Sequence, residues 1–514
     1  MKLNLAINTI STLISKLTTI FVGIFTTRYL VMGLDSNDYG FYVFMWSISS
    51  ALFFTDMGMG IAAQKKTGEY EVHKDISLLN IQINTIAVTY IFILLLFVVI
   101  NYLFITPNLD TFLKIETTKN NIKFYQNVFW IFSNLVALNF TISFYREILA
   151  GLRKIYIIEI LNSFFSISYL LIVLSFYFQK KDMEFIIYAV PLNQTIAFLL
   201  YIAIALKSIK GLRLNPLLFS FSELKSILKF SLHAYTQAVI TIIQKNVNHV
   251  LLGGVLGTIY VGFYQIASKA QEIMKLLNDF YQSNIMPATT VLISSNRHDE
   301  LKNFIVQSNR FVFFIGLLSL FPFFLLIEPL LWIWLKVKDP EIIFVARILI
   351  IEMFFRNIFS SVNTRYLLMS GKEKVCTKYA IIEFSLNILL SFIALKFFDM
   401  AAMAFARVLI TIGINFFGVM RSTGEQLNIT LKEYYFDCCR KTIIFCLLPL
   451  IYISYFSFNF GLYDWNTIRF ILVSISYGIF FIVIALSLIL EKKDKEIICN
   501  RFPKMKILFP LTKI

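Results

Sequence analysis

The sequence predicts an all-α polytopic membrane protein with about 14 transmembrane helices, and three observations support this class. First, 58% of the 514 residues are hydrophobic and only 15% are charged, so that the mean hydropathy reaches +0.73. Second, apolar runs long enough to cross a bilayer follow one another along nearly the whole chain. Third, the alternating ten-residue pattern of a transmembrane β-barrel is absent. This composition excludes a soluble globular protein.

The first predicted span begins close to Met1 and is too long for the core of a signal peptide. It ends in TTRYLVMG without a small-residue cleavage site, so we expect it to be retained. A short break at Asp399 separates the eleventh span from the twelfth. The predicted spans are 6–32, 39–62, 80–104, 124–149, 157–178, 184–206, 228–252, 258–290, 304–327, 342–368, 378–398, 401–420, 440–458 and 467–490.

Lysine and arginine residues concentrate in alternate loops, which predicts the orientation of the chain. The loops that follow the even-numbered spans are rich in cations, for example at Lys65, Arg153 and Lys207, and so is the tail from Lys492 to Lys513. The opposite loops hold few cations. We therefore expect both termini in the cytoplasm. The same bias accounts for most of the net charge of +16 without a nucleic-acid partner.

Recognisable enzyme chemistry is missing from the sequence, and we expect neither a cofactor nor a metal. There is no glycine-rich phosphate loop, nucleophile elbow or His/Cys metal cluster. The cysteines have no metal-ligand spacing and fall in spans or predicted cytoplasmic loops, where disulfides are rare. They are Cys376, Cys438, Cys439, Cys446 and Cys499.

A weak internal repeat predicts the domain organisation. The segments 37–49 and 259–271 share a Gly-Phe-Tyr core, at Gly40 and Gly262, and each opens a span. Because six spans separate the copies, the two halves would run parallel about an axis along the membrane normal. The predicted domains are two six-helix bundles (1–206 and 228–420), cytoplasmic linkers (207–227 and 421–439), two extra helices (440–490) and a basic tail (491–514).

Three spans carry a polar stripe at helical spacing, which has to face other helices or a water-filled cavity rather than lipid. The stripe of the first span ends near Thr26, and the stripe of the eighth is the most polar. The stripes consist of Asn8, Thr12, Ser15, Lys16, Thr19, Gly23 and Thr26; of Gln237, Thr241, Gln244, Lys245, Asn248 and His249; and of Gln265, Lys269, Glu272, Lys275, Asp279 and Gln282.

Four cations lie near the middle of their spans: Lys16, Lys245, Lys269 and Arg356. A central lysine or arginine costs roughly 2.5–3.5 kcal/mol on insertion scales, so these residues are candidate contacts for an anionic substrate. Arginines nearer the ends of spans can extend to the headgroups and act as interfacial anchors. Arg28, Arg310, Arg347, Arg365 and Arg407 are of this second kind, although Arg28 is also a candidate substrate contact.

Pairing within a helix is the alternative explanation for part of this set. Glu352 lies four residues before Arg356, and Glu272 lies three residues after Lys269, so these charges can neutralise each other. Lys16 and Lys245 have no acidic neighbour on their own helices. Among the acids and histidines, Asp56, His249 and Glu272 are candidate counter-charges or ion-coupling sites.

The segment 27–62 resembles the opening signature of bacterial polysaccharide flippases of the Wzx type, in the multidrug/oligosaccharidyl-lipid/polysaccharide exporter superfamily. The matching positions are Arg28, Gly33, Asp38-Tyr39-Gly40 and Asp56-Met57-Gly58. The segment ILAGLRKIY (148–156) resembles the family's loop after the fourth span. These motifs cover about the first fifth of the chain, whereas the remainder agrees in its architecture.

This resemblance implies a MATE-like fold and a flippase of the bacterial inner membrane, acting in O-antigen, lipopolysaccharide or other polysaccharide biosynthesis. Its substrate would be an oligosaccharide repeat unit on polyprenyl pyrophosphate, moved to the outer leaflet by alternating access. Membrane lipids, a coupling ion (H⁺ or Na⁺) and polysaccharide polymerase machinery are the further partners that it implies. The physical reading agrees, because buried cations in a wet cavity can replace the hydration of a pyrophosphate.

Three alternatives stay open. A flippase for a peptidoglycan lipid precursor belongs to the same superfamily, as does a multidrug/cation antiporter. The lysines argue against the antiporter, because a cation substrate favours acids. A polytopic glycan polymerase or ligase is an alternative of another class. Such an enzyme usually needs a long external loop with acids, arginines or histidines, and the external loop at 105–123 holds only Asp110 and Glu116 as acids.

Overall fold

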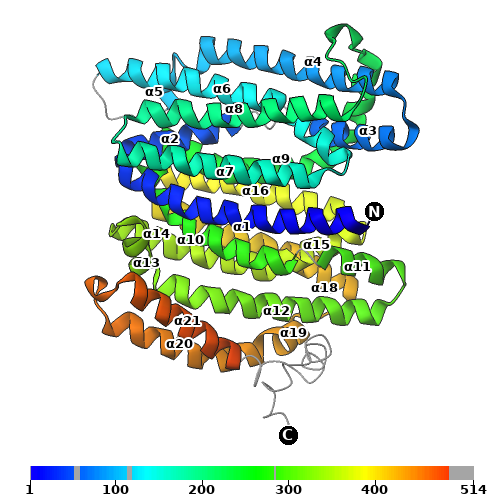
Figure 1. The fold of residues 1–514 in the computed structure, drawn as a ribbon. Helices are drawn as coiled ribbons and strands as arrows, with labels where there is room; N and C mark the ends of the chain where they lie inside the picture. Colours follow the sequence, from blue (N-terminus) through cyan, green and yellow to red (C-terminus); the bar gives the residue numbers. More distant parts are fainter. Residues whose placement is uncertain (1, 51–57, 113–118, 283–284, 485–514) are drawn as a thin grey trace. The chain divides into compact units, whose positions relative to one another are not determined.

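The computed structural model describes residues 2–50, 58–112, 119–282 and 285–484, and all regular structure in these ranges is helical (Figure 1). Ten helices or continuous helical stretches in this described part are long and apolar enough to cross a membrane. The predicted class, an all-α polytopic membrane protein, is confirmed. The spans are α1 (Lys2–Gly33), α4 (Ile76–Ile100) with η2 (Asn101–Ile105), α6 (Lys119–Gly151), α7 (Ile155–Phe178), α8 (Met183–Ser208), α12 (His298–Leu325), α16 (Glu373–Phe397), α17 (Met400–Ile414) with η5 (Asn415–Met420) and α18 (Arg421–Leu427), α19 (Leu431–Tyr434) with η6 (Tyr435–Arg440) and α20 (Lys441–Asn459), and α21 (Thr467–Ile484).

The other four predicted spans correspond to helices that are more polar or are interrupted. The span predicted at 39–62 corresponds to α2 (Ser36–Ser49) and α3 (Met59–His73), with residues 51–57 outside the described ranges. The seventh is α9 (Phe221–Val255), and the eighth is α10 (Thr258–Gln282) followed by α11 (Ile285–Ser294). The tenth is α14 (Pro340–Arg356), η4 (Asn357–Ser361) and α15 (Val362–Met369). These helices are not among the ten that length and hydropathy select in the described ranges.

Aspartate side chains cap several helix starts, which explains where the predicted spans begin. The side chain of Asp35 accepts a hydrogen bond from the backbone N–H of Asp38 at the start of α2. Asp75 and Asp339 cap α4 and α14 in the same way. Asp399 accepts from the backbone N–H of Ala402, at 2.7 Å. The predicted break at Asp399 is confirmed, because this cap begins α17 directly after α16 ends.

The chain divides into two compact units, residues 1–263 and 264–514, with the division inside α10. In the first unit, α1 packs along α7, and α6 packs against α3, α4 and α8. Its core includes the stacked rings of Tyr90 and Phe144. In the second unit, α17 packs against both α14 and α16, and α12 packs against α14 and α20. The predicted division into bundles at the 207–227 linker stays a prediction.

Gly40 of α2 and Gly262 of α10, the two glycines of the predicted repeat, lie in direct backbone contact. Both belong to the first compact unit. A Cβ atom at Gly262 would lie 3.3 Å from the Cα of Gly40, and a Cβ at Gly40 would lie 1.8 Å from the carbonyl oxygen of Thr258. Only glycine permits an approach this close. The predicted parallel repeat stays a prediction.

Candidate functional site: a buried ion-pair network

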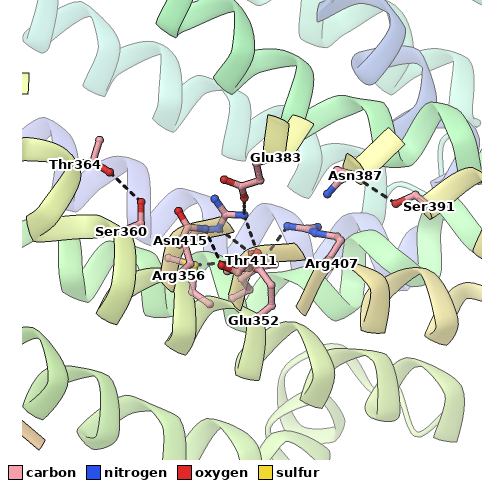
Figure 2. A network of polar contacts seen from close by, with 12 residues as sticks. Glu352, Arg356, Ser360, Thr364, Glu383, Asn387, Ser391, Arg407, Thr411 and Asn415 are labelled. Carbon is pink, nitrogen blue, oxygen red and sulfur yellow. Dashed lines mark hydrogen bonds and ion pairs between the residues drawn. The ribbon is translucent and has the colours of Figure 1, made fainter. Parts of the chain in front are cut away.

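Glu352 of α14 is the centre of a charged network inside the second unit (Figure 2). Its side chain is 0% exposed. Its Oε1 accepts hydrogen bonds from Nε of Arg356 at 2.8 Å and from the hydroxyl of Thr411 at 2.8 Å. Its Oε2 lies 3.5 Å from Nη2 of Arg407 and accepts from the side-chain amide of Gln271. Four neighbouring groups therefore compensate one buried carboxylate.

Arg356 extends the network from α14 to α16. Its Nη2 donates to Oε1 of Glu383 on α16 at 2.6 Å and to the hydroxyl of Thr411 at 3.2 Å. Arg407 of α17 also donates to the hydroxyl of Tyr264 at the start of the second unit. Figure 2 shows Arg356 between Glu352 and Glu383, with Arg407 beside them.

The two carboxylates and two guanidinium groups of this network balance in charge. Burying an isolated charge in a membrane protein is costly, whereas a paired and hydrogen-bonded charge is tolerated. The network joins α14, α16 and α17 through side chains that converge on Glu352. The charges of the network already compensate one another, so its role is to connect helices. We call this network the polar clamp.

Two π-helical segments adjoin the network. The segment η4 begins at Asn357, directly after Arg356, and η5 begins at Asn415, one turn after Thr411. Both asparagines are buried, and η4 packs against η5. Such segments occur mostly as single-turn insertions at functional sites, where they displace the helical register. The clamp therefore lies where two spans depart from regular α-helix.

The predicted cations are found in different surroundings. Lys16 is exposed on α1, and no described residue forms an ion pair with it. Arg28 is half-buried near the end of the same helix. Lys269 pairs with Glu272 at 3.0 Å on α10, as the alternative of internal pairing predicted. Lys245 belongs to α9, but its side chain lies outside the described part of the structure.

The predicted counter-charges also differ in their surroundings. Asp56 lies outside the described residues. His249 of α9 is buried, with its Nδ1 3.0 Å from the hydroxyl of Ser47 on α2. Glu272 forms an ion pair with Lys269. The structure brings together Glu352 and Arg356 as expected for internal pairing, and it adds Glu383 and Arg407, which were not among the predicted site residues.

The expectation that Arg407 is an interfacial anchor is wrong. Its side chain is only 14% exposed and forms an ion pair with Glu352. The prediction failed because Arg407 lies within two turns of the start of α17, where an arginine can normally extend to the headgroups. The helical stretch continues to Leu427, however, and the tertiary packing turns Arg407 inward toward α14.

The motif residues of the first span and second helix have structural contacts. A Cβ at Gly33 would lie 2.6 Å from the ring of Phe176 on α7, so this glycine permits close packing. Asp38 accepts a hydrogen bond from the hydroxyl of Tyr125 on α6, at 2.9 Å.

Comparison with solved structures places this architecture among known transporters. The lipid II flippase MurJ, in an inward closed conformation, matches with a TM-score of 0.69 at 15% identity, over 93% of this chain and 98% of MurJ. A multidrug resistance MATE family transporter of the MOP superfamily, in an inward-facing conformation, matches with a TM-score of 0.65 at 13% identity, over 80% of this chain and 94% of the transporter. The chain has the fold of these transporters.

A MOP superfamily transporter from Pyrococcus furiosus, described as having a binding pocket of reverse polarity, matches with a TM-score of 0.53 at 14% identity. That match covers 83% of this chain and 95% of the transporter. No protein-family model and no curated protein sequence matches the chain. The likeness is thus one of fold, and the MATE-like architecture expected from the resemblance is confirmed at that level.

Proposed function

We propose that this protein is a flippase that moves an oligosaccharide linked to polyprenyl pyrophosphate from the cytoplasmic to the outer leaflet. The observation that carries the proposal is the extent of the fold likeness. The match to a lipid flippase covers 93% of this chain, whereas the match to the multidrug transporter covers 80%. A fold that extends beyond the drug-transporter core favours a lipid-linked cargo over a small cation.

The chemistry of the predicted substrate-contacting cations supports an anionic cargo. Lys16 is exposed on an apolar helix, and no described residue neutralises it. Lys245 lies on the polar stripe of α9 and has no acidic residue beside it on that stripe. We propose that these two lysines, with Arg28, bind the pyrophosphate in place of water. The asparagine, glutamine and threonine residues of the stripes are suited to sugar hydroxyls.

The paired cations have a different proposed role. Lys269 and Arg356 are neutralised by Glu272 and by Glu352 with Glu383. In this proposal they keep polar helices packed, and Lys269 contacts the cargo only when it separates from Glu272. Transport would proceed by alternating access with the cargo near the midplane. Asp56 and His249 stay candidate sites for a coupling H⁺ or Na⁺.

The proposal places the protein in the bacterial inner membrane with both termini in the cytoplasm. It acts as a transporter without a cofactor, and surface glycans such as O-antigen or lipopolysaccharide would be the products of its pathway. A polysaccharide polymerase that consumes the flipped repeat unit is the expected functional partner. The positive-inside distribution of lysine and arginine supports the orientation.

A peptidoglycan lipid-precursor flippase is the second candidate, because the matching flippase acts on lipid II. Both cargoes carry a pyrophosphate on a polyprenyl chain and differ in the attached sugars. The discriminating measurement uses purified protein in vesicles with fluorescent lipid-linked cargo of each kind. Faster movement of the oligosaccharide-linked lipid supports the main proposal, and faster movement of lipid II supports the second candidate.

The test in cells replaces Lys16 or Lys245 by alanine in a strain without its own copy of the gene. Surface glycan is expected to fall strongly in both variants while the amount of protein in the membrane stays constant. Lys229→Ala is the matched control, because Lys229 is exposed on α9, the same helix as Lys245, but lies at the cytoplasmic start of the predicted span 228–252. Normal glycan export with both central lysines replaced would contradict the proposed roles of these residues.

A further inference from the structure

The connection between α8 and α9 is fixed to the start of α4. Asn80 donates from Nδ2 to the carbonyl oxygen of Gly211 at 2.9 Å and accepts from the backbone N–H of Arg213 at 2.8 Å. Asn84 donates to the carbonyl oxygen of Arg213 at 2.7 Å and accepts from the backbone N–H of Asn215 at 2.7 Å. The side-chain amides of Asn80 and Asn84 thus bond both N–H and C=O groups of the connecting backbone, and these hydrogen bonds fix its conformation.

This fixed segment exposes large apolar side chains. Leu217, in the 3-10 turn η3 (Pro216–Leu218), is 90% exposed, and Phe221 at the start of α9 is 75% exposed. Leu214 is exposed as well. The segment follows Ser208, where the membrane-spanning helix α8 ends, so it lies at the level where hydrocarbon meets headgroups. Apolar side chains at this depth are stable when they enter the lipid.

A dense group of cations surrounds these apolar side chains. All of its members are exposed: Lys207, Lys210, Arg213, Lys225 and Lys229. Glu223 is the one acid between residues 207 and 229, and it accepts a hydrogen bond from Gln82 of α4 at 3.1 Å. The segment 207–229 therefore carries a strong positive charge, which is complementary to the anionic lipids of a cytoplasmic leaflet.

We propose that Leu214, Leu217 and Phe221, together with Lys210, Arg213 and Lys225, form an anchor that binds anionic phospholipid. Leu217 and Phe221 enter the acyl region, and the cations donate hydrogen bonds to headgroup phosphates. The two asparagines of α4 hold the anchor in shape, so little conformational entropy is lost on binding. The anchor is independent of the cargo and goes beyond the proposed transport function.

The end of α3 provides a matched control within the same unit. Val72 is 74% exposed there, close to Phe221 in exposure. The neighbouring lysines, however, form ion pairs with glutamates: Lys65 and Lys66 with Glu69, and Lys74 with Glu71. This surface is exposed and apolar in part but nearly neutral, so it lacks the attraction to anionic headgroups.

The experiment measures the depth of a probe in the bilayer. Leu217→Cys and Val72→Cys are each introduced with Cys499→Ser, since the four described cysteines are buried. An environment-sensitive fluorophore is attached, and the protein is placed in nanodiscs of phosphatidylcholine with or without phosphatidylglycerol. A nitroxide near the lipid headgroup is expected to quench the probe at position 217 several-fold more than the probe at position 72, and most strongly with phosphatidylglycerol.

Replacing Lys210, Arg213 and Lys225 by glutamine together is expected to remove the extra quenching by anionic lipid. The same replacement of Lys65, Lys66 and Lys74 is expected to leave it unchanged. Equal quenching of the two probes, or quenching at position 217 that does not respond to phosphatidylglycerol, would overturn the proposal.

Discussion

Arg407 of α17 and Glu352 of α14 form an ion pair of 3.5 Å, although 55 residues separate them along the sequence. Arg356 binds the other carboxylate oxygen of Glu352 and also binds Glu383 of α16. Glu352 and Arg356 thus connect α14 with both α16 and α17 through ion pairs. Because each charge in the network has a partner, the loss of one member leaves another buried charge uncompensated.

Glu352→Gln is expected to destabilise the protein strongly. It removes the carboxylate that Arg356 and Arg407 share and keeps the size of the side chain, so the free energy of unfolding should fall by about 3–5 kcal/mol. Thermal unfolding in detergent measures the change. Glu425→Gln is the control, because the exposed pair of Glu425 with Arg421 at 2.9 Å should contribute only about 0–1 kcal/mol. Equal effects of the two substitutions would show that the buried network does not stabilise the fold.

Arg356 and Glu383 are expected to be coupled in a double-mutant cycle. Arg356→Met alone leaves Glu383 without its guanidinium partner, and Glu383→Gln alone leaves Arg356 with an excess of positive charge. The double variant keeps the neutral pair of Glu352 with Arg407. The double variant should therefore lose less stability than the sum of the single losses, by about 1–3 kcal/mol. Additive losses would mean that the 2.6 Å contact contributes no coupling energy.

Exchanging the charges of Lys269 and Glu272 separates pairing from cargo binding. The double substitution Lys269→Glu with Glu272→Lys keeps an ion pair at three-residue spacing on α10. If Lys269 acts only in this pair, transport by the exchanged variant should be near the original rate while each single substitution lowers it. Transport is measured with lipid-linked cargo in vesicles. Loss of transport in the exchanged variant, with unchanged thermal stability, would indicate that the cation at position 269 contacts the cargo.

Gly40→Ala is expected to disrupt the crossing of α2 with the start of α10. The new methyl group would lie 1.8 Å from the carbonyl oxygen of Thr258, so the two backbones have to separate. A marked fall in thermal stability or in the yield of folded protein is the expected result. Gly23→Ala is the control within a helix, because no atom lies within 4 Å of its added Cβ. That change should stabilise α1 by about 0.5–1 kcal/mol, and similar behaviour of the two variants would contradict the close crossing.

The class of fold and most helices follow from sequence patterns that are local. Long apolar runs have one stable arrangement in a bilayer, since backbone groups in hydrocarbon have to bond within their own segment. Aspartates such as Asp399 mark helix starts because their side chains bond nearby backbone N–H groups. Pairs such as Lys269 with Glu272 are also local, and their three-residue spacing was sufficient to raise the possibility of pairing.

The tertiary structure decided which polar residues meet across helices. Nothing in the spacing of Arg407 or Glu383 predicts that both face α14, because the rotation of a helix about its axis depends on all of its neighbours. The sequence by itself determined that this chain is a helical membrane protein with charges that cannot face lipid. Packing decided that Glu352, Glu383, Arg356 and Arg407 neutralise one another, while Lys16 has no charged partner among the described residues. Only contacts between distant segments can make that distinction, since each charge is equally costly in hydrocarbon until a partner reaches it.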